Sequence, residues 1–275
     1  MISWNGQLYN DGERPVAPRH RAVYYGDGLF ETLRMVNGEL PFWRHHWQRL
    51  NLGMQLLQLH WPAEWDAARV REEILRACPG PNARIRLSTL RSGGGHYWPG
   101  STAADVLIVT SPLPGQRFLL NEGGLELGLY EGERISAGSR LANLKTCNAL
   151  PYILAGLFAQ ENEWDEALVL NTAGRIAEAS YHNVFVLQNG RLLTPPLSEG
   201  PTAGVMRKTV LRLASDWDIP VGEAPLQVED VLAADEVWLT NAIRGVQWVR
   251  QFENQTYAGE LARQMTEQLN ELVRR

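Results

Sequence analysis

A short turn-rich segment near the middle of the chain constrains its architecture more than any other feature. Residues 111–116 read Ser-Pro-Leu-Pro-Gly-Gln, and two prolines with a glycine interrupt both helices and central strands. Strand-like and helix-like patterns occur on both sides. With 275 residues, 44% of them apolar, the chain can bury two cores. The sequence therefore predicts an N-terminal α/β domain over 1–111, a linker over 112–122 and a C-terminal domain over 123–275.

The N-terminal part begins with hairpin signals and then changes to a helical period. Asn-Gly pairs at 5–6 and 37–38 predict tight turns within 3–13 and 28–40. Trp47, Leu50 and Met54 recur at helical spacing. The expected elements that follow are helices at 45–59 and 62–77 and strands at 83–90 and 105–111.

The C-terminal part again mixes both periods, which places the chain in the α/β (α+β) class. The expected elements are a strand at 125–130, a helix at 151–162, a strand-rich block at 166–193, a helix at 205–217, a strand at 236–240 and a helix at 259–273.

Charge and composition exclude several classes of protein. A net charge of −5 argues against a nucleic-acid binder, because phosphate neutralisation needs a clustered positive excess. The first twenty residues show no apolar signal or membrane segment, so we expect no membrane association and a cytoplasmic location. Cys78 and Cys147 lack metal-ligand spacing and are expected to be reduced, with no metal bound.

Lys145 is one of only two lysines among 26 basic residues, the other being Lys208. A chain that otherwise uses arginine and keeps a lysine in a loop before a helix indicates a need for an amine. An amine can form an imine with a carbonyl, which a guanidinium cannot. A structural, solvent-facing lysine is the alternative, so the neighbouring sequence has to decide.

Imine chemistry with pyridoxal phosphate needs an anion beside the pyridine nitrogen and a cradle for the phosphate. Glu178 follows a turn and is flanked by small residues. Gly204 opens the expected helix at 205–217, where free N–H groups receive anions. A strand ends at Thr240 and Asn241, which offer further polar groups. Each of these is a weak signal by itself.

Together these segments resemble the class IV aminotransferases, the fold type IV pyridoxal phosphate enzymes with a D-amino-acid aminotransferase-like two-domain fold. The resemblance covers nearly the whole chain and rests on residues 25–32, 46–50, 144–148, 178–185, 194–196, 204–207 and 235–241.

The resemblance implies a role for each matched residue. Lys145 would be the catalytic Schiff-base lysine and proton shuttle, and Glu178 the partner of the pyridine nitrogen. The phosphate would be held by Arg49, Gly204, Val205, Met206, Asn241 and Ala242. The family usually has threonine at the position of Met206, so only a backbone contact is expected there. The substrate-binding residues would be Tyr25, Phe30, Arg91, His96 and Tyr97. A homodimer and a small-molecule amino substrate are also implied.

The reaction stays open between a lyase and a transaminase. Residues 91–97 resemble the Arg-Gly-Ser-Gly-Gly-Arg-Gly-Tyr loop of aminodeoxychorismate lyases, which act in folate biosynthesis, and Thr240 to Ala242 resembles their Cys-Asn-Ala segment. The second loop arginine is missing, which leaves carboxylate recognition to Arg91, helped by His96 or Arg244. The alternatives are a branched-chain L-amino acid or D-amino acid transaminase and, more remotely, a non-catalytic interaction protein.

Overall fold

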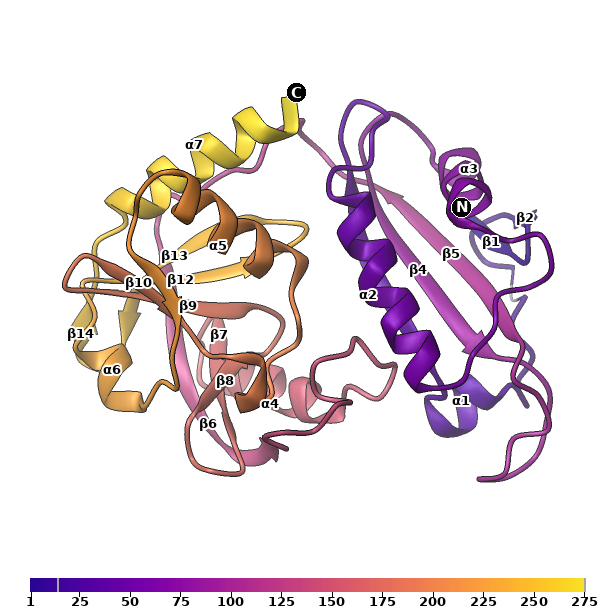
Figure 1. The fold of residues 1–275 in the computed structure, drawn as a ribbon, viewed down its shortest axis with the longest axis horizontal. Helices are drawn as coiled ribbons and strands as arrows, with labels where there is room; N and C mark the ends of the chain where they lie inside the picture. The colour runs from indigo at the N-terminus through magenta and orange to yellow at the C-terminus, as the bar shows by residue number, and fades with distance from the viewer. Residues whose placement is uncertain (14, 275) are drawn as a thin grey trace. The chain divides into compact units, whose positions relative to one another are not determined.

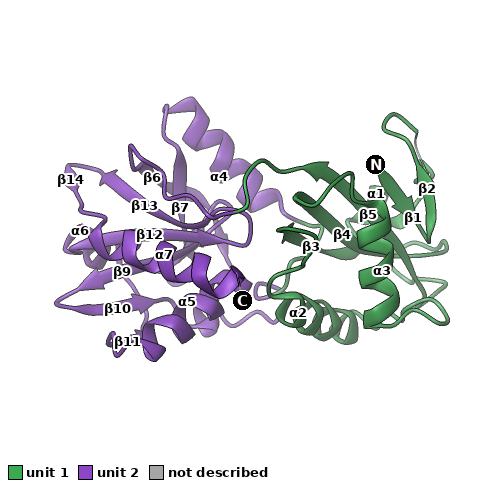
Figure 2. Ribbon diagram, turned by 90° about the horizontal axis from the view of Figure 1, so that it is seen from above, with its two compact units in different colours: residues 1–116, 144–148 green, residues 117–143, 149–275 purple. Residues whose placement is uncertain are grey.

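A computed structural model describes residues 1–13 and 15–274 of the chain. The chain forms two compact units (Figure 2). Unit 1 contains Met1–Gln116 and Leu144–Asn148, and unit 2 contains Arg117–Asn143 and the chain from Ala149 onward. The division between residues 116 and 117 falls within the segment expected to be a linker. Each unit mixes helices with a β-sheet, in agreement with the expected fold class (Figure 1).

The segment Leu144–Asn148 differs from the expected domain division, because it joins unit 1 rather than the C-terminal domain. Phe30 donates its backbone N–H to the carbonyl of Lys145 at 2.9 Å, and Cys147 donates to the carbonyl of Gly28 at 3.0 Å. The segment therefore adds to the open edge of a unit 1 strand. Sequence position alone gave no sign of this long-range pairing.

The sheet of unit 1 has the order β2-β1-β5-β4-β3, and the strand pairs are antiparallel. Its strands are β1 (Ile2–Trp4), β2 (Gln7–Tyr9), β3 (Gly28–Met35), β4 (Ala83–Arg91) and β5 (Ala104–Pro112). Asn5 and Gly6 form the expected first turn at φ values of 50° and 86°. The turn at Asn37 is also present, but the second strand of the expected hairpin does not form, and a single bridge joins Val36 to Glu39. Strand β3 pairs instead with β4 along its whole length.

Three helices belong to unit 1: α1 (Arg21–Tyr25), α2 (Trp43–Leu56) and α3 (Ala67–Ala77). Leu50 and Met54 of α2 join Val70 and Ile74 of α3 in the core that covers the sheet. Helix α3 begins five residues later than expected, because the Asp66 side chain caps it by accepting the N–H of Arg69 at 2.8 Å.

Unit 2 contains a nine-stranded mixed sheet with the path β11-β10-β9-β12-β13-β6-β7-β8, and β14 pairs with β13. Its strands are β6 (Leu125–Ile135), β7 (Glu166–Asn171), β8 (Ile176–Ala179), β9 (Asn183–Gln188), β10 (Arg191–Thr194), β11 (Val221–Glu223), β12 (Glu236–Asn241), β13 (Gly245–Phe252) and β14 (Gln255–Thr256). Strand β13 was not expected, although it joins β12 to β6.

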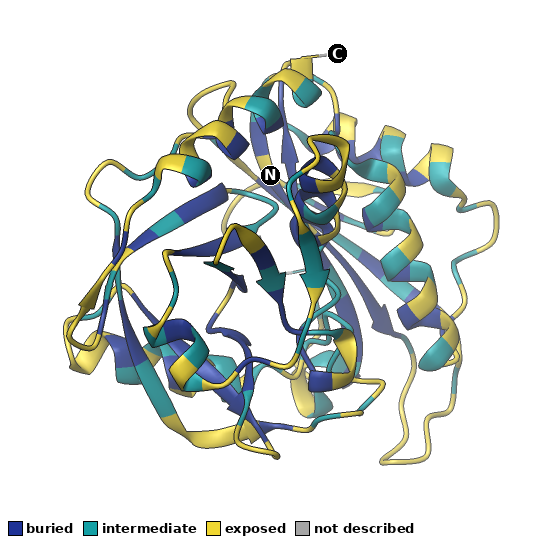
Figure 3. Ribbon diagram, turned by 60° about the vertical axis from the view of Figure 1, so that its left-hand side comes forward, coloured by how far each residue is buried: buried dark blue, intermediate teal, exposed yellow. Residues whose placement is uncertain are grey.

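The helices of unit 2 are α4 (Leu150–Glu161), α5 (Val205–Asp216), α6 (Val228–Leu232) and α7 (Glu260–Arg274), with a 3₁₀ turn at Leu197–Glu199. One core cluster lies inside the curled sheet and includes Leu168, Val184 and Leu239. A smaller cluster joins Ala155 of α4 to Val169 of β7. Figure 3 shows that strands carry most of the buried residues and that helices alternate between buried and exposed positions.

Candidate functional site

Lys145 lies beside β3 with its main chain fixed by the strand edge. Its Nζ is 4.7 Å from the centre of the Phe30 ring, and the guanidinium carbon of Arg86 is 3.7 Å from the same ring centre. Burial lowers the pKa of Arg86. The structure thus brings together Lys145 and Phe30, two of the residues expected in the site, and adds Arg86, which sequence reasoning did not single out.

Arg49, expected to hold phosphate, makes a two-pronged ion pair with Glu31. Its Nε and Nη2 donate to the two carboxylate oxygens at 2.8 and 2.5 Å, and His46 Nδ1 lies 2.7 Å from Oε2 of the same carboxylate. Burial is the largest single influence on Glu31 and would raise its pKa, but the charge of Arg49 and the hydrogen bonds from Arg49 and His46 together outweigh burial and lower the pKa to about 2. The ionised Glu31 therefore fixes the direction of the Arg49 guanidinium.

Glu178 on β8 is buried and accepts hydrogen bonds from three neighbouring residues of unit 2. Its Oε1 accepts from the Tyr152 hydroxyl at 2.6 Å and from the N–H and hydroxyl of Thr202 at 2.9 and 3.0 Å. Its Oε2 accepts from Nδ2 of Asn183 at 3.1 Å. Burial and the Glu178 charge raise the pKa of Tyr152, so this phenol remains a donor. Such donors stabilise a carboxylate in its ionised form.

Asn183 links the three parts of unit 2 that the sequence nominated separately. Besides its bond to Glu178, it donates to the carbonyl of Thr202 at 2.9 Å and pairs across the sheet with Thr240. A Cβ built on Gly204 would lie 1.8 Å from Oδ1 of Asn183, so only glycine fits there. Asn183 was not among the residues expected in the site, although it lies in the segment 178–185 that carries the family resemblance.

The start of α5 can receive an anion. Gly204 precedes the helix in an extended conformation and provides no side-chain cap, and Val205 and Met206 in the first turn are buried. The leading N–H groups of a helix need acceptors, and the helix dipole favours negative charge there. Thr240, across the sheet from Asn183, has a buried hydroxyl without a hydrogen-bond partner in the described part of the chain. These groups fit a phosphate.

Asn241 ends β12 and shapes the turn that follows. Its Oδ1 accepts the backbone N–H groups of Ile243 and Arg244 at 3.0 and 2.8 Å. This side-chain turn fixes the backbone around Ala242, which was expected to contact phosphate.

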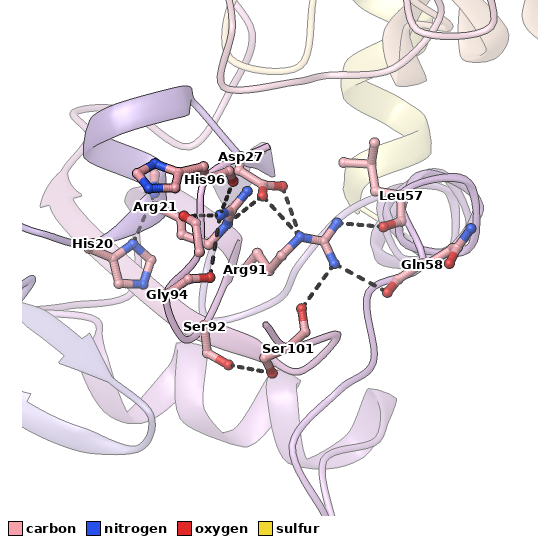
Figure 4. Close-up of polar contacts among 12 residues, drawn as sticks. His20, Arg21, Asp27, Leu57, Gln58, Arg91, Ser92, Gly94, His96 and Ser101 are labelled. Carbon is pink, nitrogen blue, oxygen red and sulfur yellow. Dashed lines mark hydrogen bonds and ion pairs between the residues drawn. The ribbon is translucent and has the colours of Figure 1, made fainter. Parts of the chain in front are cut away.

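The loop at 92–101 is held by a cluster of charges in unit 1 (Figure 4). The carboxylate of Asp27 lies between two guanidinium groups. It accepts hydrogen bonds from Nε of Arg21 and from Nε of Arg91, each at 2.9 Å. Arg21 Nη1 also donates to the carbonyls of Gly95 and His96 at 2.8 and 2.6 Å. The cluster therefore fastens the loop to the start of β3.

Arg91 does not adopt the orientation expected of a carboxylate-binding residue. It is buried, and beyond Asp27 its guanidinium donates to the carbonyls of Leu57, Gln58 and Ser101. These contacts use the guanidinium internally, so we assign Arg91 to holding the loop. The sequence could not show this because the accepting carbonyls belong to distant segments.

Three other residues expected to bind substrate, Tyr25, His96 and Tyr97, lie near Arg21. The Tyr25 ring is 5.5 Å from the Tyr97 ring, and the guanidinium carbon of Arg21 is 5.0 Å from the Tyr25 ring centre. Tyr97 is 92% exposed, and His96 is exposed beside it. Tyr25, His96 and Tyr97 are thus grouped in unit 1, with one face open.

Neither a metal-binding cluster nor a membrane-spanning helix occurs among the described residues. No set of three or more His, Cys, Asp or Glu side chains in 1–13 and 15–274 is arranged to hold a metal ion. No helix within the described chain has both the length and the apolar character needed to cross a bilayer.

Comparison with known proteins gives consistent matches. The family model described as amino-transferase class IV matches residues 28–252. An aminodeoxychorismate lyase of Vibrio harveyi is 29% identical over 234 residues, covering 82% of this chain and 83% of the relative. A putative branched-chain-amino-acid aminotransferase of Methanocaldococcus jannaschii is 27% identical over 278 residues, covering 98% and 96%.

Solved structures give the same two groups. The branched-chain aminotransferase of Thermoproteus uzoniensis superposes with a TM-score of 0.90 at 24% identity, covering 99% of this chain and 94% of that one. The 4-amino-4-deoxychorismate lyase of Pseudomonas aeruginosa superposes with a TM-score of 0.83 at 28% identity, covering 98% of both chains.

Proposed function

Because the chain belongs to the class IV aminotransferase family, whose enzymes depend on pyridoxal phosphate, we propose that it acts on 4-amino-4-deoxychorismate as a lyase. The products are p-aminobenzoate and pyruvate. This proposal gives the amine of Lys145, the carboxylate of Glu178 and the polar groups near Gly204 distinct tasks in one reaction.

The residues of unit 2 suit the two ends of the cofactor. Glu178, ionised by its donors, would pair with the pyridine nitrogen. The N–H groups of Val205 and Met206, together with Asn241 and Ala242, would receive the phosphate. Bound pyridoxal phosphate supplies an electron sink that stabilises negative charge on the carbon next to the substrate nitrogen.

Lys145 moves the proton. Its Nζ takes the proton from the carbon that bears the substrate amine. The ring C–O bond then breaks, which makes the ring aromatic and releases the enolate of pyruvate, and the proton held by Nζ converts this enolate to pyruvate. The Phe30 ring lies under this amine, with its centre 4.7 Å from Nζ, and shields one side of the amine from water. Tyr25 and Tyr97 offer aromatic surface to the substrate ring.

The observation that carries the lyase proposal is that Asn241 uses both its amide oxygen and its amide nitrogen in contacts within unit 2. Its Oδ1 caps the turn while its Nδ2 contacts His182, so this position needs both a donor and an acceptor. The Cys-Asn-Ala segment that the chain resembles in aminodeoxychorismate lyases has asparagine at this position. The 29% identity to the Vibrio harveyi lyase supports the same reaction.

A branched-chain transaminase is the second candidate, favoured by the orientation of Arg91. With that guanidinium committed to Asp27 and backbone carbonyls, the open face near Tyr25 and Tyr97 is mainly aromatic. An aromatic surface favours an apolar amino acid over a substrate with additional carboxylates.

Spectra and product assays distinguish the two reactions. Purified protein with pyridoxal phosphate is mixed with aminodeoxychorismate, L-leucine or D-alanine without a keto acid. Release of pyruvate and p-aminobenzoate from the first supports the lyase. Conversion of the cofactor's visible absorption to that of pyridoxamine phosphate by an amino acid, without pyruvate from aminodeoxychorismate, overturns it in favour of a transaminase. Lys145→Ala should abolish either activity, whereas the control Lys208→Ala, at an exposed position of α5, should retain it.

We also propose that the enzyme is a homodimer. Helix α4 exposes Leu150, Ile153, Leu154 and Leu157, four apolar side chains at helical spacing. A contiguous apolar face of this kind indicates an interaction surface, and a second copy of the chain would cover it.

A further inference from the structure

A buried histidine in unit 2 connects two distant polar residues. His182 precedes β9 and is fully buried. Its Nδ1 lies 2.5 Å from Oε1 of Glu166 on β7, and its Nε2 lies 2.6 Å from Nδ2 of Asn241 at the end of β12. Glu166 is also buried, at 1% side-chain exposure. The three side chains therefore form one chain of contacts from β7 to the turn after β12.

The direction of each hydrogen bond follows from the backbone of that turn. Oδ1 of Asn241 accepts the N–H groups of Ile243 and Arg244, which leaves Nδ2 facing His182. An amide nitrogen only donates, so Nε2 of His182 accepts and carries no proton. The proton of the neutral ring is then on Nδ1, which donates to the Glu166 carboxylate.

We propose that His182 is a positioning residue for the phosphate of the cofactor. Glu166 fixes the tautomer and ring of His182, His182 fixes the amide of Asn241, and that amide fixes the turn around Ala242. The inference rests on the proposed function only in placing the phosphate at this turn. The binding energy of the phosphate depends on donors that are held in place before the ligand arrives, because ordering them afterwards costs affinity.

Two substitutions at His182 separate its contact with Glu166 from its contact with Asn241. His182→Asn retains an amide that can reach Glu166 but removes the acceptor for Asn241. His182→Gln places an amide oxygen near the former Nε2 and retains that acceptor. The inference therefore expects the asparagine variant to be impaired more than the glutamine variant, although both remove the imidazole ring from the same buried position.

The test measures cofactor binding to the apo-protein without any substrate. Wild type, His182→Asn and His182→Gln are titrated with pyridoxal phosphate and, separately, with pyridoxal, which lacks the phosphate. We expect His182→Asn to bind pyridoxal phosphate about tenfold more weakly, because the displaced turn would lose about one hydrogen bond to the charged phosphate. Pyridoxal binding should stay within about twofold of wild type, and His182→Gln should recover most of the loss.

A phosphorus NMR spectrum of the bound cofactor gives a second readout, because a displaced turn changes the environment of the phosphate. Equal weakening of both ligands, or unchanged binding of both with only a lower melting temperature, would overturn the inference and leave His182 a purely structural residue. If the His182 variants do not fold, Glu166→Gln, which removes the carboxylate that fixes the His182 ring, provides the same phosphate-specific test. Substrate assays on wild type decide the proposed reaction independently of these results.

Discussion

The hydroxyl of Tyr152 donates a 2.6 Å hydrogen bond to Oε1 of Glu178, which ties helix α4 to strand β8. Three other donors also bind this carboxylate, from Thr202 and Asn183. Because the same carboxylate is proposed to pair with the pyridine nitrogen, the phenol contributes indirectly to the reaction by holding Glu178 ionised and oriented.

Tyr152→Phe tests this contribution. The variant removes one hydrogen bond to a charged acceptor, worth about 1.5–3 kcal/mol, so kcat should fall by about tenfold or more while the protein stays folded. The control is Tyr130→Phe. The Tyr130 hydroxyl donates to the exposed Glu133, so its removal should leave kcat unchanged. Steady-state kinetics with whichever substrate the product assay supports would measure the difference. Equal kcat values for the two variants would remove Tyr152 from the argument.

Gly204→Ala tests the close approach between α5 and β9. The new methyl group would lie 1.8 Å from Oδ1 of Asn183, so either the helix start or the asparagine has to move. We expect pyridoxal phosphate to bind at least about tenfold more weakly, since a shift of this size disturbs both Glu178 and the anion site. Gly123→Ala is the control, because its methyl group meets no atom within 4 Å in the described structure. Fluorescence titration of the apo-proteins compares them.

Glu31→Gln should destabilise unit 1. It leaves the nearly buried Arg49 without its carboxylate, and breaking a buried pair costs about 3–5 kcal/mol. The matched control is Glu39→Gln, which breaks an exposed pair with Arg71 and should cost under about 1 kcal/mol. Urea unfolding at pH 7 measures both losses. Similar values for the two variants would contradict a buried role for Glu31.

The same cluster predicts how wild-type stability depends on pH. Burial lowers the pKa of His46 below its ordinary 6.5, so below pH 6.5 the unfolded chain binds the proton more readily and stability falls. Arg49 and His46 together overcome burial and hold the pKa of Glu31 at about 2, so this carboxylate stabilises the fold above about pH 4.5 and loses its effect as pH falls toward 2. In Glu31→Gln the loss between pH 4.5 and 2 should be shallower, as urea midpoints across this range would show.

Arg21→Ala should release the loop at 92–101. Arg21 holds the carbonyls of Gly95 and His96, and the neighbouring Tyr97 and Trp98 are exposed sites for chymotrypsin. Cleavage there should become faster, and KM should rise with a smaller change in kcat, because the loop bears part of the proposed substrate surface. Arg212→Ala, an exposed residue of α5 near Asp216, is the control. Unchanged cleavage in Arg21→Ala would show that Arg91 and Asp27 suffice.

Ile153→Glu should weaken the proposed dimer. Ile153 is 54% exposed in the middle of the apolar face of α4, and a charge buried there without a partner opposes association. Sedimentation at micromolar concentration should give a dimer mass for wild type and a monomer mass for the variant. A monomer mass for wild type would overturn the homodimer proposal.

Short-range patterns in the sequence were sufficient to predict many of the helices, strands and turns. Helical spacing at Leu50 and Met54 predicted α2, Asn-Gly pairs predicted turns, and the scarcity of lysine singled out Lys145. These signals are local, because periodicity and turn chemistry depend on a few neighbouring residues. The order of the segments was enough to indicate the family, which the match over residues 28–252 confirmed.

Contacts between side chains from distant segments could be seen in the folded chain but in no local pattern. Arg91 was read as a ligand for substrate, but carbonyls of Leu57 and Gln58, more than thirty residues away in sequence, occupy its guanidinium. Asn183 and His182 gave no strong signal, although they connect Glu178, Gly204 and Asn241. Hydrogen bonds between distant segments depend on sheet register and helix packing, which only the folded chain brings together.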